Sequence, residues 1–289
     1  MSWTSRPESG GRTTGQVEIF RICFRVSVAK LWPRFKIKYR SLRSSLLYKR
    51  SYQMNNTRPI ISFTFDDVPK SSCVLGRKIL KAYGLKATYF ISMSLMDKVY
   101  TIGAAFSRSD LENLIADGHE IGCHTYDHLD AWKTNPSSFE ASIRDNRAKF
   151  SEIYPGRSLR TFSYPINAPH PSNKQKAGER FTCCRGGGQS YNSNIIDLNL
   201  LKGYFIDKRN RDDRNRIFEI INESHGKNGW LIFGTHDIDE NPSPYGCTPQ
   251  LFEDLVRFSL RSGARILPVY DACVLLGISK ERVAFSLVS

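Results

Sequence analysis

The chain has 289 residues, 40% of them hydrophobic, so it is long enough to bury the core of one large α/β domain. Its formal net charge is +14, and residues 1–55 supply ten of these charges, from twelve Lys or Arg against two Glu. No run approaches the ~20 apolar residues of a membrane-spanning helix, and the N-terminus lacks the pattern of a standard secretion signal, so we expect a cytoplasmic protein.

The first segment in chain order, residues 1–55, is basic and is interleaved with apolar and aromatic side chains. One interpretation is a solvated, poorly ordered arm. Another is a segment that lies on an anionic membrane surface, which would place the protein peripherally at the inner membrane surface. A third is that translation begins at Met54, directly before the first core strand.

From residue 60 onward, short β-type runs alternate with longer amphipathic segments, and this predicts an α/β barrel with about seven parallel strands. The expected strands lie near residues 60–65, 87–91, 120–123, 161–164, 181–184, 230–235 and 265–268. The expected helices lie near residues 73–83, 109–117, 137–153, 213–224, 249–262 and 270–276. Thr248 followed by Pro249 is the favoured order of cap and proline for a helix start.

The seven cysteines are odd in number and form no C-x-x-C pair. They therefore indicate neither a disulfide framework nor a thiolate zinc site, and we expect reduced thiols. For the adjacent Cys183 and Cys184, two small residues in a buried strand are favoured over a strained vicinal disulfide.

Two adjacent carboxylates, Asp66 and Asp67, follow the first apolar run of the core, residues 60–65. Side chains splay at the carboxyl end of a strand, so one carboxylate can face a metal while the other faces the substrate. The alternative is a simple turn, because Asp before Val-Pro-Lys suits a turn well.

The histidines His124 and His128 follow the run expected to form the third strand. Residues four apart share one face of a helical turn, so we expect both imidazoles to reach one divalent cation, with Asp67 completing the set. A surface turn is the alternative for the histidine pair alone. Such a site leaves Asp66 free to act as a base in metal-assisted hydrolysis at neutral pH.

A third histidine, His236, ends the apolar run 230–235. At the carboxyl end of a barrel strand it would stand on the same face as the other groups and could protonate a leaving nitrogen or oxygen. A packed core histidine is the alternative. His119 and His225 lack such placement, and we expect them to be structural or solvent-exposed.

Taken in order, three segments resemble the successive motifs of the polysaccharide deacetylases of carbohydrate esterase family 4, which include chitin, peptidoglycan and nodulation-factor deacetylases. These segments are Thr64-Phe65-Asp66-Asp67, His124-Thr125-Tyr126-Asp127-His128 and Leu231-Ile232-Phe233-Gly234-Thr235-His236. The resemblance covers about residues 58–270. It implies a distorted (β/α) barrel of about seven strands, in a catalytic domain over residues 56–289.

Carried over by position, the resemblance implies a role for each of five side chains. Asp66 is the general base, and His236 is the general acid. Asp67, His124 and His128 bind a divalent metal, zinc or another ion. The implied reaction is hydrolytic removal of an acyl group, chiefly N-acetyl, from a sugar unit of a polysaccharide or glycan precursor.

The chain departs from the family where the third motif reads Arg-x-Pro-Tyr, because Ser163 stands at the arginine position. Serine cannot supply the ion pair that orients the catalytic aspartate. Another cation such as Arg185 could enter the site instead, and Arg185 and Tyr164 are also candidates for substrate binding. The backbone N–H of Ile166 can still donate to an oxyanion, because any residue except proline provides it.

The aspartate that orients the acid in the family has three candidates here, Asp197, Asp207 and Asp213. Besides Tyr164, the aromatic residues Trp132 and Tyr245 are candidates for stacking on sugar rings. Packing is the alternative explanation for each ring.

We therefore expect a metal-dependent deacetylase whose partner is an acylated glycan, with no nucleic acid partner. Two alternatives stay open at this point. One is a hydrolase of an O-acetyl ester, a formamide or a small cyclic amide. The other is a glycan-binding protein that retains the barrel without catalysis, which the missing motif arginine favours.

Overall fold

The computed structural model describes residues 38–166, 168–208 and 214–278. The chain divides into two compact units, Met1–Leu42 and Arg43–Ser289, and the larger unit contains the strands reported below. Most of the predicted basic arm, residues 1–37, lies outside the described residues. None of the helices in the described ranges combines the length and the apolar composition needed to cross a membrane.

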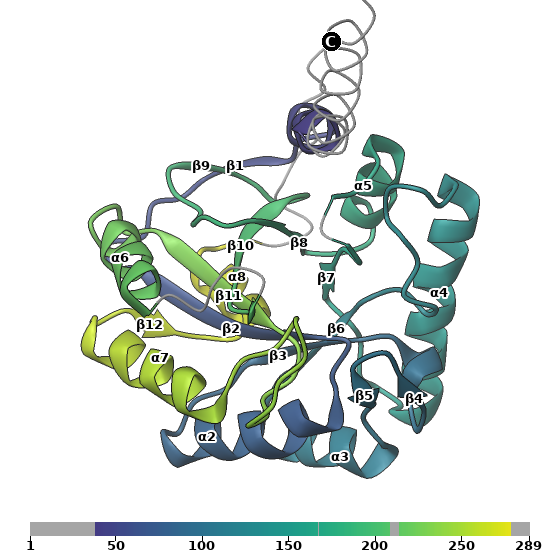
Figure 1. Ribbon diagram of the computed structural model, residues 1–289. Coiled ribbons are helices and arrows are strands. Elements are labelled where there is room, and N and C mark those ends of the chain that lie inside the picture. Colours follow the sequence, from purple (N-terminus) through teal and green to yellow (C-terminus); the bar gives the residue numbers. More distant parts are fainter. Residues whose placement is uncertain (1–37, 167, 209–213, 279–289) are drawn as a thin grey trace, which may run out of the picture. The chain divides into compact units, whose positions relative to one another are not determined.

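Seven parallel strands form a closed barrel, which confirms the expected fold class (Figure 1). In order around the barrel they are β2 (Ile60–Asp66), β3 (Thr88–Ile91), β6 (Glu120–Cys123), β7 (Thr161–Ser163), β8 (Cys183–Gly188), β10 (Leu201–Phe205) and β11 (Trp230–Thr235). Closure comes from the pairing of β11 with β2, which runs from Trp230 beside Ile60 to Thr235 beside Phe65. The carboxyl ends of the strands therefore meet at one face, where such barrels place their sites.

One of the seven strands is not the one that the sequence predicted. Residues 265–268 were expected to complete the barrel, but β12 (Arg265–Ile266) is only a two-residue strand that pairs with the start of β2. The barrel is completed instead by β10, which carries an exposed Lys202 and a glycine, Gly203. Lysine and glycine both weaken the β-type pattern, so this strand was missed.

The helices lie around the strands, apart from the last one, which lies behind the centre of the barrel in this view and packs against the core that includes Trp230 (Figure 1). They are α2 (Arg77–Ala82), α3 (Arg108–Ala116), α4 (Pro136–Ile153), α5 (Pro171–Gly178), α6 (Arg214–His225), α7 (Pro249–Arg261) and α8 (Val269–Leu275). The six expected helices are present to within a few residues, and Thr248 caps α7 by accepting a hydrogen bond from the backbone of Leu251, as predicted. Two α-helical segments of the described residues were not predicted: residues 38–46, which lie in the predicted basic arm, and α5, whose short polar sequence shows no apolar periodicity.

Side chains of β2 alternate between two cores, as the period of a strand requires. Ile61, Phe63 and Phe65 pack outward in the core between the barrel and the helices, whereas Ile60 belongs to the core that includes Trp230. Trp230 also donates from its ring nitrogen to the Ser62 hydroxyl at 3.0 Å. By this parity Asp66, the last residue of β2, points into the barrel.

Part of the predicted basic arm, residues 44–53, packs as a piece of the folded domain. The buried Lys174 donates from Nζ to the carbonyl oxygen of Ser44 at 2.7 Å and pairs with the Asp197 carboxylate at 2.6 Å. Arg50 is buried as well, and its backbone N–H donates to the same carboxylate at 3.0 Å. The basic composition of this stretch therefore does not set it apart from the barrel.

Two short two-stranded sheets accompany the barrel in the described residues. β1 (Ser51–Gln53) pairs antiparallel with β9 (Ile195–Asp197). β4 (Val99–Tyr100) and β5 (Gly103–Ala104) form a hairpin between β3 and α3. The thiols of Cys183 and Cys184 are buried in β8 and do not pair with each other.

Candidate active site

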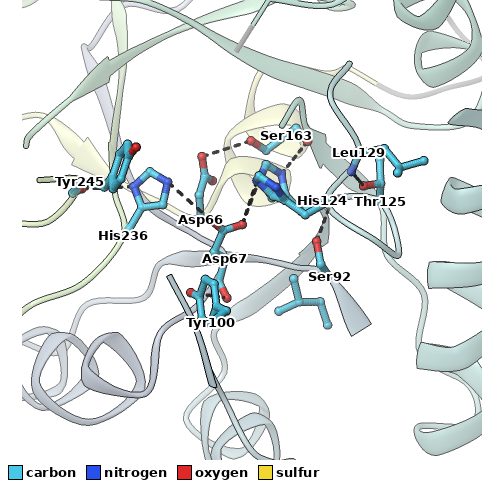
Figure 2. Close-up of polar contacts among 12 residues, drawn as sticks. Asp66, Asp67, Ser92, Tyr100, His124, Thr125, Leu129, Ser163, His236 and Tyr245 are labelled. Carbon is cyan, nitrogen blue, oxygen red and sulfur yellow. Dashed lines mark hydrogen bonds and ion pairs between the residues drawn. The ribbon is translucent and has the colours of Figure 1, made fainter. Parts of the chain in front are cut away.

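The paired carboxylates stand at the carboxyl end of β2, where the chain leaves the strand through a strained turn. Asp67 and Val68 have φ angles of 58° and 50°. This left-handed region is costly for a residue with a Cβ and most costly for a β-branched one such as valine. Strain of this kind persists where the surrounding structure enforces it, and it clusters at functional sites. Here it places Asp66 and Asp67 between His124 and His236 (Figure 2).

The two imidazoles of His124 and His128 converge on Asp67. The distances from Asp67 Oδ1 are 3.5 Å to Nε2 of His124 and 3.2 Å to Nε2 of His128. The geometry arises differently from our expectation, because residues 124–128 do not form a helical turn. The chain reverses instead through left-handed conformations at Thr125 and His128, with φ angles of 60° and 51°.

These three side chains fit a divalent metal. His124 Nδ1 lies 2.8 Å from the carbonyl oxygen of Ser163, so Nδ1 carries the proton and the lone pair of Nε2 faces Asp67. Burial lowers the pKa of His124 to about 4, which keeps the imidazole neutral near pH 7. Asp67 Oδ1 is buried and accepts no hydrogen bond. The Nε2 lone pair of His124 and the unpaired Oδ1 of Asp67 thus face each other, with Nε2 of His128 close by, and a cation between these atoms would stabilise the arrangement.

The three ligand atoms lie within 4.8 Å of one another, and in the described ranges no other group of three such residues converges in this way. One carboxylate and two imidazoles suit zinc and other first-row divalent ions. The expected convergence of Asp67, His124 and His128 is therefore present in the structure.

Asp66 is held by a guanidinium. Nη2 of Arg185 contacts both carboxylate oxygens, at 2.5 Å for Oδ2, and the Ser163 hydroxyl donates to Oδ2 at 3.4 Å. Burial alone would raise the pKa of the Asp66 carboxyl, but Arg185, together with His124 and His236, holds that pKa below its usual range. Asp66 is therefore a carboxylate at neutral pH.

His236 follows β11 and faces the carboxylates from the opposite side (Figure 2). Its Nε2 lies 4.0 Å from Asp67 Oδ2, and its Nδ1 lies 3.2 Å from the backbone carbonyl oxygen of Tyr245. A carbonyl can only accept, so Nδ1 donates and Nε2 is directed to the site. The loop that brings this carbonyl into place is tied by Asp237, which accepts hydrogen bonds from the backbone and hydroxyl of Ser243 at 2.7 and 2.5 Å.

The aspartate expected to orient His236 is not Asp197, because that carboxylate is engaged by Lys174. Asp207 is buried in the segment after β10. Asp213 lies outside the described residues. The contact that the structure provides to Nδ1 of His236 comes from a backbone carbonyl, which no side-chain pattern could have indicated.

A cavity of about 400 Å³ opens over these groups. Its walls are the five residues already named together with Thr101, Ile102, Ile166 and Tyr245. Ile166 is 60% exposed and has a φ of 63°, so it is a third β-branched residue in the left-handed region at the site, after Val68 and Thr125. Thr101 and Ile102 form the tip of the β4–β5 hairpin, and no sequence pattern predicted their place at the site.

Two predicted substrate-binding residues are placed differently by the structure. The Tyr164 ring is fully buried, and its hydroxyl donates to the carbonyl oxygen of Asn199 at 2.9 Å, so the expectation that it contacts substrate is wrong. Arg185 is also fully buried, and it binds Asp66 instead of lining the cavity. Tyr245, 39% exposed, does line the cavity, whereas Trp132 packs edge-on against His170 outside it.

Comparison with known proteins identifies similar sequences. Residues 53–181 match the family model described as polysaccharide deacetylase. A peptidoglycan-N-acetylglucosamine deacetylase of Bacillus cereus is 30% identical over 107 residues, which are 35% of this chain and 45% of that protein. The chain spans less than half the length of the curated relatives that it matches.

Solved structures share the fold. The chitin deacetylase of Colletotrichum lindemuthianum superposes with a TM-score of 0.55 at 17% identity, over 80% of this chain and 92% of that one. A family 4 acetyl xylan esterase of Clostridium thermocellum, solved in complex with a cobalt ion, gives a TM-score of 0.54 at 20% identity, over 80% of this chain and the whole of that one. At these identities the likeness establishes the barrel architecture.

Proposed function

We propose that the chain is a metal-dependent hydrolase that removes an acyl group, chiefly N-acetyl, from a sugar unit of a polysaccharide or glycan precursor, on the basis of the match of residues 53–181 to the polysaccharide deacetylase family model. The observation that carries the proposal is the buried Asp67 Oδ1, which accepts no hydrogen bond and faces Nε2 of both His124 and His128. The ionised Asp66 stands beside it.

Asp67, His124 and His128 are the proposed ligands of the metal, and zinc is the ion that we propose. A divalent cation in this position supplies Lewis acidity, which polarises an acyl carbonyl and makes a nearby water more acidic. The carbonyl oxygen of Ser163 fixes the tautomer of His124, so that Nε2 is available as a ligand without rearrangement.

The remaining residues supply the proton transfers. Asp66 accepts a proton from the water that attacks the acyl carbon, since it is ionised and lines the cavity. The backbone N–H of Ile166 donates to the oxygen that gains negative charge. His236 then gives a proton to the departing nitrogen, and its Nδ1–H bond to Tyr245 supports the imidazolium in that role. The products are a carboxylic acid and a free amine.

The amide is our first choice of substrate because the curated relative from Bacillus cereus is named for N-acetylglucosamine in peptidoglycan. An O-acetyl ester is the second candidate, because a structural neighbour is an acetyl xylan esterase. The proposal of a catalytically inactive glycan-binding protein loses its main support, since Arg185 provides the cation that Ser163 lacks.

A direct comparison of substrates tests the proposal. Acetate release would be measured from N-acetylated chitooligosaccharides, from soluble N-acetylated peptidoglycan fragments and from acetylated xylan, with zinc-loaded protein and with chelated protein. We expect release from the amides that chelation abolishes. The surface variant Asp254→Asn on α7 serves as the control and should behave like wild type. Release from acetylated xylan alone would favour the esterase, and no release from any acylated glycan would contradict the proposal.

A further inference from the structure

Arg185 is a fully buried cation inside the barrel, directly beside the proposed base. Its Nη2 contacts both oxygens of Asp66 and donates to the Ser163 hydroxyl at 2.5 Å, and its Nη1 donates to the carbonyl oxygen of Gly186 at 3.1 Å. A buried charge without a partner is very costly, so this arginine and this carboxylate depend on each other.

Two aromatic rings hold the guanidinium. The carbon of the guanidinium lies 5.2 Å from the ring centre of Phe90 on β3 and 4.9 Å from that of Phe205 on β10. Contacts of a cation with ring faces are favourable and strongest where water is excluded. The rings therefore restrict the side chain of Arg185 to one direction, toward Asp66.

Three glycines on neighbouring strands make room for this arrangement. A Cβ at Gly122 would lie 2.4 Å from the Phe90 ring, and one at Gly234 would lie 3.0 Å from the Phe205 ring. A Cβ at Gly203 would lie 3.3 Å from Cδ of Arg185 and 2.8 Å from a backbone oxygen. The space around the guanidinium is thus built by residues of β6, β10 and β11 together.

The strand register places Ser163 on β7 directly beside Arg185 on β8. Side chains at paired positions of neighbouring parallel strands point to the same side, and both of these reach Asp66. An arginine at position 163 or at position 185 would therefore extend from the same level of the barrel interior toward Asp66. The other of the two positions then needs a small side chain, so that the guanidinium has room.

We propose that Arg185 is the positioning residue of the proposed base Asp66, and that positions 163 and 185 are interchangeable sources of this guanidinium. This inference rests on the proposed deacylation for its kinetic test. Arg185 holds the carboxylate of Asp66 at the wall of the cavity. The rings of Phe90 and Phe205 prevent Arg185 itself from reaching the substrate.

The test compares Arg185→Ser, Arg185→Lys, the exchange variant Ser163→Arg/Arg185→Ser and the surface control Arg257→Ser. We expect Arg185→Ser to lower kcat about 100-fold, the size typical of a misplaced catalytic group, with KM and the zinc stoichiometry almost unchanged. Arg185→Lys should recover little of the loss, because an ammonium has neither the second nitrogen that donates to the Gly186 carbonyl nor the planar group that lies over the rings of Phe90 and Phe205. The kcat of the exchange variant should be at least about tenfold higher than that of Arg185→Ser.

Wild-type kcat in folded, zinc-loaded Arg185→Ser would overturn the proposal. So would a folded, zinc-loaded exchange variant that is no faster than Arg185→Ser. If Arg185→Ser does not fold, the exchange variant and Arg185→Lys still decide the matter, because the proposal requires the exchange variant to be the faster of the two.

A second measurement does not depend on any substrate. The free energy of unfolding in urea would be compared for Asp66→Asn, Arg185→Ser and the double variant of these two. The proposal requires the double variant to be less destabilised than the sum of the single variants, because the two groups depend on each other. Additive effects would refute the pairing. Coupling without any acetate release would instead count against the proposed function alone.

Discussion

Acidification from pH 8 to pH 5 is expected to destabilise the folded domain, and His119 makes a contribution that can be isolated. Its side chain is buried, with 7% of the residue exposed, and Nδ1 accepts a hydrogen bond from the backbone N–H of Ala87 at 3.0 Å. Burial lowers the pKa of His119 from the usual 6.5 to about 4. Protonation would charge a buried ring and break that hydrogen bond.

The sign and size of the effect follow from linkage. Between pH 6.5 and pH 4 the unfolded chain binds a proton at His119 and the folded chain does not, so stability falls as the pH falls. These two pKa values correspond to a loss of about 2 kcal/mol at pH 5 and almost none at pH 8. That is a large share of the roughly 5–15 kcal/mol by which domains are stable.

The assay is urea unfolding of the chelated protein at pH 8 and pH 5, for wild type, His119→Asn and the exposed control His225→Asn. Contributions from other groups cancel when the pH dependence of each variant is compared with that of wild type. We expect His119→Asn to lose about 2 kcal/mol less than wild type between the two pH values, and His225→Asn to match wild type. Equal pH dependence in wild type and His119→Asn would refute the reasoning.

Two further predictions concern the N-terminal segment and the loop behind the proposed acid, His236. We propose that the basic N-terminal segment binds anionic membranes, so deletion of residues 1–53 should abolish salt-sensitive binding to anionic vesicles, and vesicle binding that survives the deletion would contradict this. The same deletion should lower the urea midpoint of the barrel because it removes the buried Arg50 and its hydrogen bonds to Asp197, Phe181 and Thr182, and an equal midpoint would contradict that expectation. Gly246→Ala places a Cβ 2.3 Å from the backbone oxygen of Asp237, so it should displace the Tyr245 carbonyl and lower kcat about tenfold at unchanged zinc content. An unaltered kcat would show that this loop does not orient the proposed acid.

The parts of the fold that were predicted correctly are those with continuous apolar patterns. The runs of β2 and β11 are buried on both faces, and each combines apolar residues with only small polar or glycine residues between them until the functional residue that ends or follows it. β10 was missed because Gly203, which a barrel strand tolerates poorly, is needed there to accommodate Arg185. α5 was missed because its buried residues include Asn173 and Lys174, whose side-chain nitrogens donate hydrogen bonds to backbone carbonyls of distant segments.

The site residues that belong to sequence motifs could be predicted. The contacts that backbone groups of distant segments make in the site could not. The paired aspartates and the histidines could be identified by residue type and order, but the helical turn assumed for the two metal histidines was wrong, since the chain turns through left-handed residues there. The partnership of Arg185 with Asp66 depends on strand register and on ring packing. The carbonyl of Tyr245 at His236 depends on the path of a loop. Neither feature leaves a local signal in the sequence.

The central claim is that Asp67 holds the metal while Asp66 works on the substrate, and one paired measurement tests it most directly. Zinc content and acetate release from an N-acetylated chitooligosaccharide would be determined on the same preparations of wild type, Asp66→Asn and Asp67→Asn. The account predicts one zinc per chain and almost no release for Asp66→Asn, and loss of both zinc and release for Asp67→Asn. Full acetate release by zinc-loaded Asp66→Asn, or full zinc content in Asp67→Asn, would contradict it.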